Sequence, residues 1–167
     1  HLEFKFEKER DPSNRLYSNG VDVTPLIRTP EVSMLASQVS AIPGVRAALL
    51  GLQRTLGCAG RAILEGRDIG TVVFPDADVK FFLTANVEER AKRRLAELEA
   101  VGGNVPSFED LKNQIIQRDH GDSTRAIAPL KKAADAIEID TSNLTLDEVV
   151  GQMKKMIQDK LKLSGDR

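Results

Sequence analysis

An arginine and an aspartate, Arg67 and Asp68, stand side by side shortly after an apolar run at residues 62–64. We interpret that run as a short buried strand, and a second apolar run follows at residues 79–83. In open α/β sheets ligands bind outside the carboxyl ends of the strands, which is where these two side chains would lie. A guanidinium can hold phosphate oxygens, and a carboxylate can accept a hydrogen bond from an exocyclic amine. The two residues could also simply form a salt bridge with each other.

A second group of charged residues, Arg118, Asp122 and Arg125, is spaced regularly along the chain. Intervals of four and seven residues place the three side chains on one face if the segment is helical. Gly121 lies among them and is a poor helix residue, so we predict a hinge there. Paired arginines beside a hinge suit a mobile lid that closes on phosphates, because a guanidinium matches the geometry of phosphate oxygens. A solvated helix face is the alternative interpretation of the same spacing.

Two further arginines, Arg90 and Arg94, stand four residues apart in a basic stretch. The simple interpretation is a solvent-exposed helix whose arginines pair with Glu89 and Glu97. No G-x-x-x-x-G-K-[ST] phosphate-binding loop occurs in the 167 residues. The arginines could therefore surround a phosphate, but the sequence contains no loop of the kind that grips a nucleoside triphosphate.

The composition limits the classes of protein and partner. The net charge is -1, 41% of the residues are hydrophobic and 29% are charged, which is typical of a soluble globular protein. This charge gives no general reason for binding nucleic acid or an anionic membrane, and no stretch resembles a membrane span or a signal peptide. With one cysteine, Cys58, and two histidines, we expect no internal disulfide and no structural zinc site. We therefore expect a cytoplasmic protein.

The first 60 residues carry the signals of a small antiparallel sheet followed by two helices. The start of the chain alternates apolar and polar residues, and a tight-turn signal at residues 18–20 precedes a further alternation. Thr29 and Pro30 provide a cap and an N1 proline for the first helix. The predicted elements are antiparallel strands within residues 2–27 and helices over residues 30–40 and 45–56. We expect residues 1–60 to form an α+β lobe.

From residue 61 onward strand and helix signals alternate, which favours a parallel sheet covered by helices. Asn86, Ser107 and Thr145 each precede an acidic residue by three positions, a pattern that marks helix starts. Lys80 interrupts an otherwise apolar strand, and we expect it at a sheet edge. The predicted elements are strands at residues 61–66, 79–83 and 136–139, and helices over residues 86–100, over residues 107–119 and from residue 145 onward. The fold class is therefore α/β, with a core over residues 61–167 and a lid at about residues 101–128.

Three separated stretches, taken together, resemble the cytidylate kinase family of nucleoside monophosphate kinases. They are Gly66-Arg67-Asp68-Ile69-Gly70-Thr71-Val72-Val73-Phe74-Pro75, residues 36–40 with Val45-Arg46, and residues 118–129. Three such motifs in the right order are not expected by chance, and the resemblance extends from residue 1 to about residue 160. It implies a P-loop kinase-like parallel sheet with helices, in which residues 1–60 form an insertion that binds the acceptor nucleotide.

The resemblance implies a role for each candidate residue in the transfer of a phosphoryl group from ATP to CMP or dCMP. Ser37 and Arg46, which sequence chemistry alone does not select, would read the cytosine ring together with Asp68. Asp122 would hold the ribose hydroxyls. The residues that would surround the phosphates are Arg67, Arg118 and Arg125. Those that would meet ATP are Arg90 and Arg94, with Thr141 near the adenine.

The printed sequence departs from the family at its start, because the family begins with a strand, a glycine-rich loop carrying lysine and a helix, which do not occur here. The family uses Mg²⁺ together with ATP, and the loop that supplies a magnesium ligand is absent. We expect these 167 residues alone to be inactive. We also expect the strands at residues 61–66 and 79–83 to lose the neighbour that separates them. They would then pair directly, borrow a strand from another copy, or leave the gap open to water.

Two other functions remain open on the sequence. The chain could be a non-catalytic nucleotide-binding module, or it could be a related kinase whose acceptor is UMP or AMP. Small nucleotides are the expected partners in every case, and an oligomer could form through the gap in the sheet. Binding titrations with CMP, UMP and AMP separate the acceptors.

Overall fold

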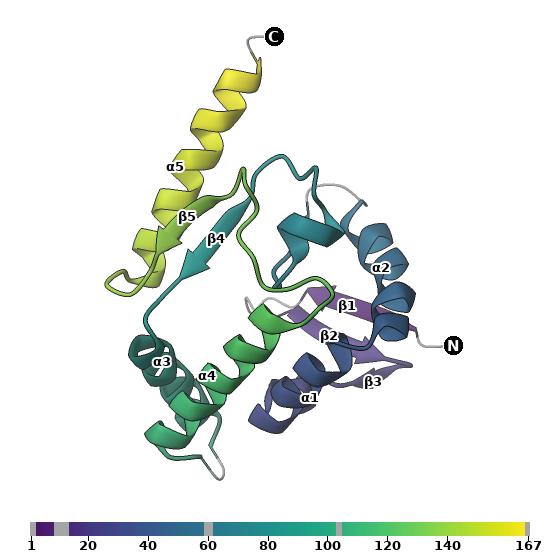
Figure 1. Cartoon of the computed structure of the whole chain (residues 1–167), viewed down its shortest axis with the longest axis vertical. Helices are drawn as coiled ribbons and strands as arrows, with labels where there is room; N and C mark the ends of the chain where they lie inside the picture. Colours follow the sequence, from purple (N-terminus) through teal and green to yellow (C-terminus); the bar gives the residue numbers. More distant parts are fainter. Residues whose placement is uncertain (1–2, 9–13, 59–61, 103–104, 166–167) are drawn as a thin grey trace.

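The computed structural model describes residues 3–8, 14–58, 62–102 and 105–165, and Figure 1 shows how its elements are arranged. The N-terminal part has a three-stranded antiparallel sheet in the order β1-β2-β3, followed by two α-helices. Its elements are β1 (Phe4–Lys8), β2 (Asn14–Ser18), β3 (Val21–Asp22), the 3₁₀ turn η1 (Leu26–Arg28), α1 (Pro30–Ser40) and α2 (Pro43–Gly57).

The turn between β2 and β3 follows from its two residues, Asn19 and Gly20. Both have positive φ angles, 49° and 80°, which asparagine and glycine adopt at low cost and which suit a two-residue hairpin. The antiparallel sheet predicted within residues 2–27 is confirmed for the described residues. Leu2 and residues 9–13 lie outside them.

Helices α1 and α2 begin at residues suited to a first turn. The Thr29 hydroxyl accepts a hydrogen bond from the Val32 amide at 3.3 Å, and Pro30 opens α1. Helix α2 begins at Pro43, two residues before the predicted start, because the first turn leaves its N–H groups unpaired and so tolerates proline. Both predicted helices are confirmed with this shift.

From residue 62 onward the described residues form two parallel strands and three α-helices. Strand β4 pairs with β5 so that Phe81 lies opposite Ile137. The predicted caps at residues 86, 107 and 145 each accept a hydrogen bond from the amide three residues further on. The elements are the π-helical turn η2 (Ile69–Val73), β4 (Phe81–Thr84), α3 (Val87–Val101), α4 (Phe108–Thr124), β5 (Ile137–Asp140) and α5 (Leu146–Gly165). The prediction of parallel strands alternating with helices is confirmed here, and Figure 1 shows α5 extending away from the other helices.

The strand predicted at residues 61–66 is wrong for the described residues 62–66, which form no strand. A strand requires a hydrogen-bonded neighbour, and no described strand pairs with this segment. Ile63, which lies in the run interpreted as buried, is 97% exposed. Apolar character alone was therefore not enough to form the strand.

Lys80 was predicted at a sheet edge; it lies directly before β4, one of the two strands of its sheet, but it is only 8% exposed. Its ammonium group donates hydrogen bonds to the Pro75 carbonyl and to both carboxylate oxygens of Asp135, the latter at 2.9 Å. A buried lysine retains its charge only when such partners replace water. Lys80 therefore connects the segment before β4 to the segment before β5.

The hinge predicted at Gly121 is not present, since α4 continues through this residue to Thr124. Helix α4 packs against both α1 and α3, and these tertiary contacts outweigh the low helix propensity of one glycine. The lid predicted at about residues 101–128 stays a prediction. The continuous helix α4 gives it no support from a hinge at Gly121.

The buried core is small and lies mainly in the C-terminal part. Its side chains are Val73, Ala91, Leu111, Ile139 and Val149. The accessible surface is 12152 Å², compared with roughly 8,000 Å² for a compact protein of 18.3 kDa. Among the described residues no single helix is long and apolar enough to cross a membrane, and α1 and α2 meet that test only as a pair bent by 101°.

We expect the protein to lose stability in acid, because hydrogen bonds lower the pKa of two carboxyl groups in its C-terminal part. The pKa of Asp135 lies below its usual 3.8 because Lys80 hydrogen-bonds it, and hydrogen bonds from Thr145 lower the pKa of Glu148 below 4.5. A carboxyl with a lower pKa in the folded state adds stability that is present above the unfolded pKa and is lost as the pH falls through the folded value. Urea unfolding followed by circular dichroism should therefore show the free energy of unfolding falling below about pH 5.

The double variant Asp135→Asn, Glu148→Gln should lose less stability between neutral pH and pH 3.8 than the parent chain does. An acid slope identical to that of the parent chain would contradict this assignment.

Candidate functional site

A cavity of about 420 Å³ opens between α1, α2, the segment that contains η2 and the end of α4. This volume is in the range of pockets that bind small molecules. Both polar and apolar side chains line it, the apolar ones including Leu49, Val72 and Ile127. The predicted catalytic and acceptor-binding residues all line this one cavity: Ser37, Arg46, Arg67, Asp68, Arg118, Asp122 and Arg125.

Asp122 is the central anion of this group and is only 2% exposed. One carboxylate oxygen accepts a hydrogen bond from the Ser37 hydroxyl at 2.7 Å, which joins α4 to α1. Arg67 Nε lies 3.3 Å from the other oxygen, and Arg118 Nε lies 3.7 Å from it. Arg125 Nη1 approaches the first oxygen at 3.7 Å. Asp122 therefore has one short hydrogen bond and three longer ionic contacts.

Asp68 is a second anion of the cavity, and α2 binds it through Arg46. Arg46 Nη2 donates a hydrogen bond to one carboxylate oxygen, and Arg125 Nη2 lies 3.7 Å from the other. Both arginines are also held by Ser40, because Arg46 donates to its carbonyl at 3.2 Å and Arg125 to its hydroxyl at 3.1 Å. Arg125 Nε further donates to the Ala128 carbonyl at 2.6 Å. These contacts fix the orientation of two guanidinium groups towards the cavity.

The turn η2 determines where Arg67 and Asp68 point. The amides of residues 71–73 converge on the Asp68 carbonyl at 2.9–3.3 Å, and the Phe74 amide donates to the Ile69 carbonyl at 2.7 Å. These bonds close a wide turn directly after Asp68. The backbone is therefore held, and the two charged side chains project from its start.

Asp119 belongs to the same cluster, although sequence reasoning did not select it. It accepts a hydrogen bond from Arg90 Nη2, and Arg67 Nη1 lies 3.7 Å from its other oxygen. Asp119 and Asp122 are three residues apart on α4 and thus on one face, which is the sequence signal that could have identified it.

The cluster carries more positive than negative charge and contains buried polar atoms without hydrogen bonds. Five arginines (residues 46, 67, 90, 118 and 125) contact three aspartates (residues 68, 119 and 122). Burial lowers the pKa of Arg118, and the nearby positive charge of Arg67 lowers it further. Among the described side chains, the buried nitrogen and oxygen atoms that lack a hydrogen-bond partner all lie in this cluster: Arg90 Nε, Arg118 Nε, Asp119 Oδ1, Asp122 Oδ2 and Arg125 Nη2. A bound anion would satisfy the guanidinium groups and offset the excess positive charge.

The predicted ATP-binding residues do not line the cavity among the described residues. Arg90 reaches the margin of the cluster through Asp119, while Arg94 pairs with Glu97 at 3.0 Å. Thr141 donates a hydrogen bond to the Thr84 carbonyl at 3.0 Å, at the end of the parallel strands. Arg90 thus joins the cluster through Asp119, and the positive charge of Arg94 acts on Arg118, whereas Thr141 lies at the end of the parallel strands.

The interpretation of the α3 arginines as forming helix-surface ion pairs with Glu89 and Glu97 is confirmed. Arg93, not Arg90, pairs with Glu89 at 3.2 Å. Arg93 also donates to the Thr141 hydroxyl at 3.1 Å and to the Thr141 carbonyl at 2.6 Å. It thus joins α3 to the loop after β5, a role that its position in a basic stretch did not indicate.

The described residues do not form a site suited to Mg²⁺. No group of three or more histidine, cysteine, aspartate or glutamate side chains in this part of the chain could hold a metal ion. The aspartates of the cavity lie together with arginines, and these cations oppose the binding of another. The cavity is therefore suited to an anion.

The parallel strands, the flanking helices and the arginine-lined cavity define an α/β protein whose cavity has a composition suited to an anion. A model of the cytidylate kinase family matches residues 1–159. The chain is 48% identical to a cytidylate kinase of Lactobacillus gasseri over 155 residues, which are 93% of this chain and 67% of that protein. It is 51% identical to a cytidylate kinase of Geobacter sulfurreducens over 146 residues, which are 87% of this chain and 62% of that protein.

The chain belongs to the cytidylate kinase family, and its fold is thus of the P-loop kinase α/β type. It is also 48% identical over 158 residues to a bifunctional pantoate ligase/cytidylate kinase of Synechococcus sp. (strain RCC307), covering 95% of this chain and 31% of that protein. The chain therefore spans less than a third of the bifunctional relative and about two thirds of the single-function relatives.

Proposed function

We propose that this chain provides the acceptor site of a cytidylate kinase, which transfers a phosphoryl group from ATP to CMP or dCMP. The observation that carries the proposal is the single cavity lined by all seven residues assigned to acceptor and phosphate binding. The names of the relatives support CMP as the acceptor. The buried guanidinium atoms without hydrogen bonds support binding of its phosphate.

Different side chains of the cavity would hold the base, the ribose and the phosphate of CMP. Asp68, held by Arg46, would accept a hydrogen bond from the exocyclic amine of cytosine, and Ser37 of α1 lines the same cavity. Asp122 would accept hydrogen bonds from the ribose hydroxyls. The phosphate would bind among Arg67, Arg118 and Arg125, whose contacts to Asp122 are long enough, at 3.3–3.7 Å, to be replaced by stronger ones.

Phosphoryl transfer depends on alignment and on positive charge around the transferred group. The arginines would supply part of that charge and would orient the acceptor oxygen towards the γ-phosphate. Arg90 and Arg94 on α3 are the proposed contacts to ATP, with Thr141 near the adenine. Because the described residues do not suit Mg²⁺, we assign it no ligand in this chain.

The experiment that tests the proposal is calorimetric titration of the chain with CMP, UMP and AMP. The parent chain should bind CMP most tightly, and Asp68→Asn should weaken CMP binding by about 1.5–3 kcal/mol, since it removes a hydrogen bond to a charged group. UMP has a carbonyl in place of the amine, so Asp68→Asn should lower the affinity for UMP much less than the affinity for CMP.

Asp78→Asn is the matched control because Asp78 is exposed and does not line the cavity. Binding of UMP or AMP as tight as that of CMP would refute the acceptor assignment. Equal CMP affinity of Asp68→Asn and the parent chain would refute the role of Asp68.

A further inference from the structure

The backbone of η2 is held from outside the cavity by an arginine that the proposed function does not use. Arg54 on α2 donates hydrogen bonds from Nε to the Val73 carbonyl at 3.1 Å and from Nη2 to the Val72 carbonyl at 3.2 Å. A planar guanidinium can satisfy two adjacent carbonyls at once, which an ammonium group cannot do with the same geometry. Arg54 does not line the cavity, so it has no contact with the proposed substrate.

Helix α2 contacts the segment at residues 66–75 at two further points. Near its start, Arg46 binds the Asp68 carboxylate. At its end, Gly57 lies so close to the Phe74 ring that an added Cβ would be 2.3 Å from Cζ. Arg54 lies between these contacts, so one helix holds both the side chain of Asp68 and the backbone that follows it.

Lys80 holds the same segment from the other direction. Its ammonium group donates to the carbonyl of Pro75, two residues after the end of η2, and is balanced by Asp135. Its aliphatic stem packs against Gly70, where an added Cβ would lie 3.2 Å from Lys80 Cδ. Lys80 is buried and does not line the cavity. The carbonyls at the end of the turn thus have two cationic donors from two different parts of the chain.

We propose that Arg54 and Lys80 are positioning residues for CMP recognition: they hold the turn so that the Asp68 carboxylate keeps its direction into the cavity. This inference rests on the proposed function. The amides that converge on the Asp68 carbonyl belong to residues 71–73, and Arg54 holds the carbonyls of two of these residues. Replacing either cation should therefore change the direction of the Asp68 carboxylate, because the hydrogen-bonded backbone of η2 connects the two.

The test measures CMP affinity by calorimetry in Arg54→Met, Arg54→Lys and Lys80→Met. Arg54→Met and Lys80→Met should raise the dissociation constant about tenfold, because a small displacement of a recognition group costs much of its interaction. The CMP affinity of Arg54→Lys should lie between the affinities of Arg54→Met and the parent chain. Arg15→Met is the matched control, since Arg15 pairs with Asp22 on the N-terminal sheet at 2.8 Å, away from the cavity.

A double-mutant cycle separates positioning from general stability. If the cations act through Asp68, then Arg54→Met and Lys80→Met should change CMP affinity by about twofold or less in the Asp68→Asn background. Unchanged affinity of both single variants, or effects that add fully to that of Asp68→Asn, would overturn the proposal.

Hydrogen exchange of the Val73 and Phe74 amides without nucleotide gives a readout that does not depend on CMP. Exchange should be faster in Arg54→Met and Lys80→Met and unchanged in Arg15→Met. If the parent chain does not bind CMP, the proposed function fails, and this exchange result alone decides whether the two cations hold the turn. Equal exchange in all variants would overturn the inference.

Discussion

Replacing Asp122 by asparagine should lower the free energy of unfolding by about 3–5 kcal/mol, the usual cost of removing one partner from a buried ionic cluster. Asp122 is 2% exposed, and its carboxylate lies within 3.7 Å of Arg67, Arg118 and Arg125. Asparagine keeps the size of the side chain and an acceptor for Ser37 but leaves the guanidinium groups to repel one another. Urea unfolding followed by circular dichroism measures the change. Tryptophan fluorescence cannot serve as the signal, because the chain has no tryptophan.

Asp76→Asn is the control, since Asp76 is exposed and should change the stability little. High salt should reduce the cost of Asp122→Asn only in part, because buried charges are screened less than exposed ones. Stability of Asp122→Asn equal to that of the parent chain would show that Asp122 does not offset the arginines.

The second large effect is expected for Arg125→Met, which should weaken CMP binding about 100-fold while leaving cytidine binding nearly unchanged. Arg125 is held by the Ala128 carbonyl and the Ser40 hydroxyl, and its buried Nη2 has no hydrogen-bond partner. Two charge-assisted hydrogen bonds to a phosphate would account for an effect of this size. Cytidine has no phosphate, so the difference between the two ligands isolates that contribution.

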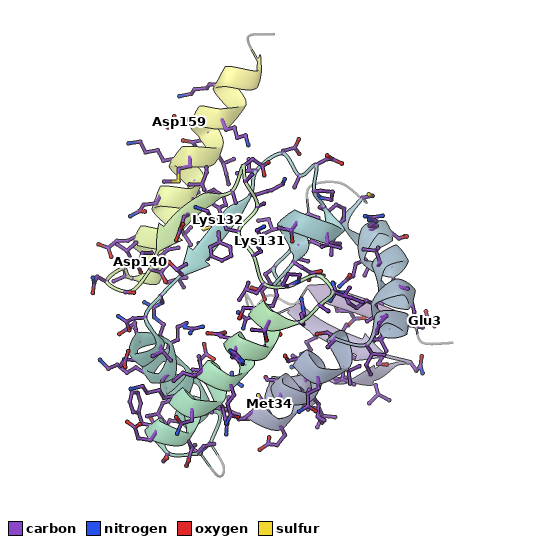
Figure 2. All side chains as sticks on the ribbon, in the orientation of Figure 1. Glu3, Met34, Lys131, Lys132, Asp140 and Asp159 are labelled. Atoms are coloured by element: carbon purple, nitrogen blue, oxygen red, sulfur yellow. The ribbon has the colours of Figure 1, made fainter. Side chains whose placement is uncertain are left out.

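Lys132→Met is the matched control for this measurement. Lys132 lies on the segment between α4 and β5, labelled in Figure 2, and forms an exposed ion pair with Glu138 at 2.7 Å. Its removal should leave both affinities unchanged. Equal weakening of CMP and cytidine by Arg125→Met would show that Arg125 does not bind the phosphate.

The sequence was a reliable guide where local hydrogen bonds determine the structure. The start of α3 follows from Asn86 and Glu89 alone, because the cap forms within one turn. The run at residues 62–64 has an equally clear apolar pattern but is no strand, since a strand depends on a distant neighbour. Gly121 failed as a hinge for a related reason: α4 packs against α1, which is remote in sequence, as well as against the neighbouring α3, and these contacts favour a continuous helix.

In the candidate site too, some residues could be predicted from local sequence spacing and others could not. Arg118, Asp122 and Arg125 could be found from helical spacing, because they lie on one helix face or just beyond its end. Ser37 was assigned only through the family resemblance, since its partner Asp122 is 85 residues away. Arg54 was missed because its acceptors are backbone carbonyls. Every residue has such a carbonyl, so no residue type in the sequence indicates the contact.

The parallel pairing of β4 with β5 has a consequence for the order of folding. Phe81 pairs with Ile137, 56 residues further on, so the chain between them must close a long loop before the first strand bond forms. Helices α3 and α4 lie within that loop and pack against each other as near neighbours in sequence. We therefore expect this helical hairpin to form early, to shorten the effective loop, and to make sheet closure the slow step of folding.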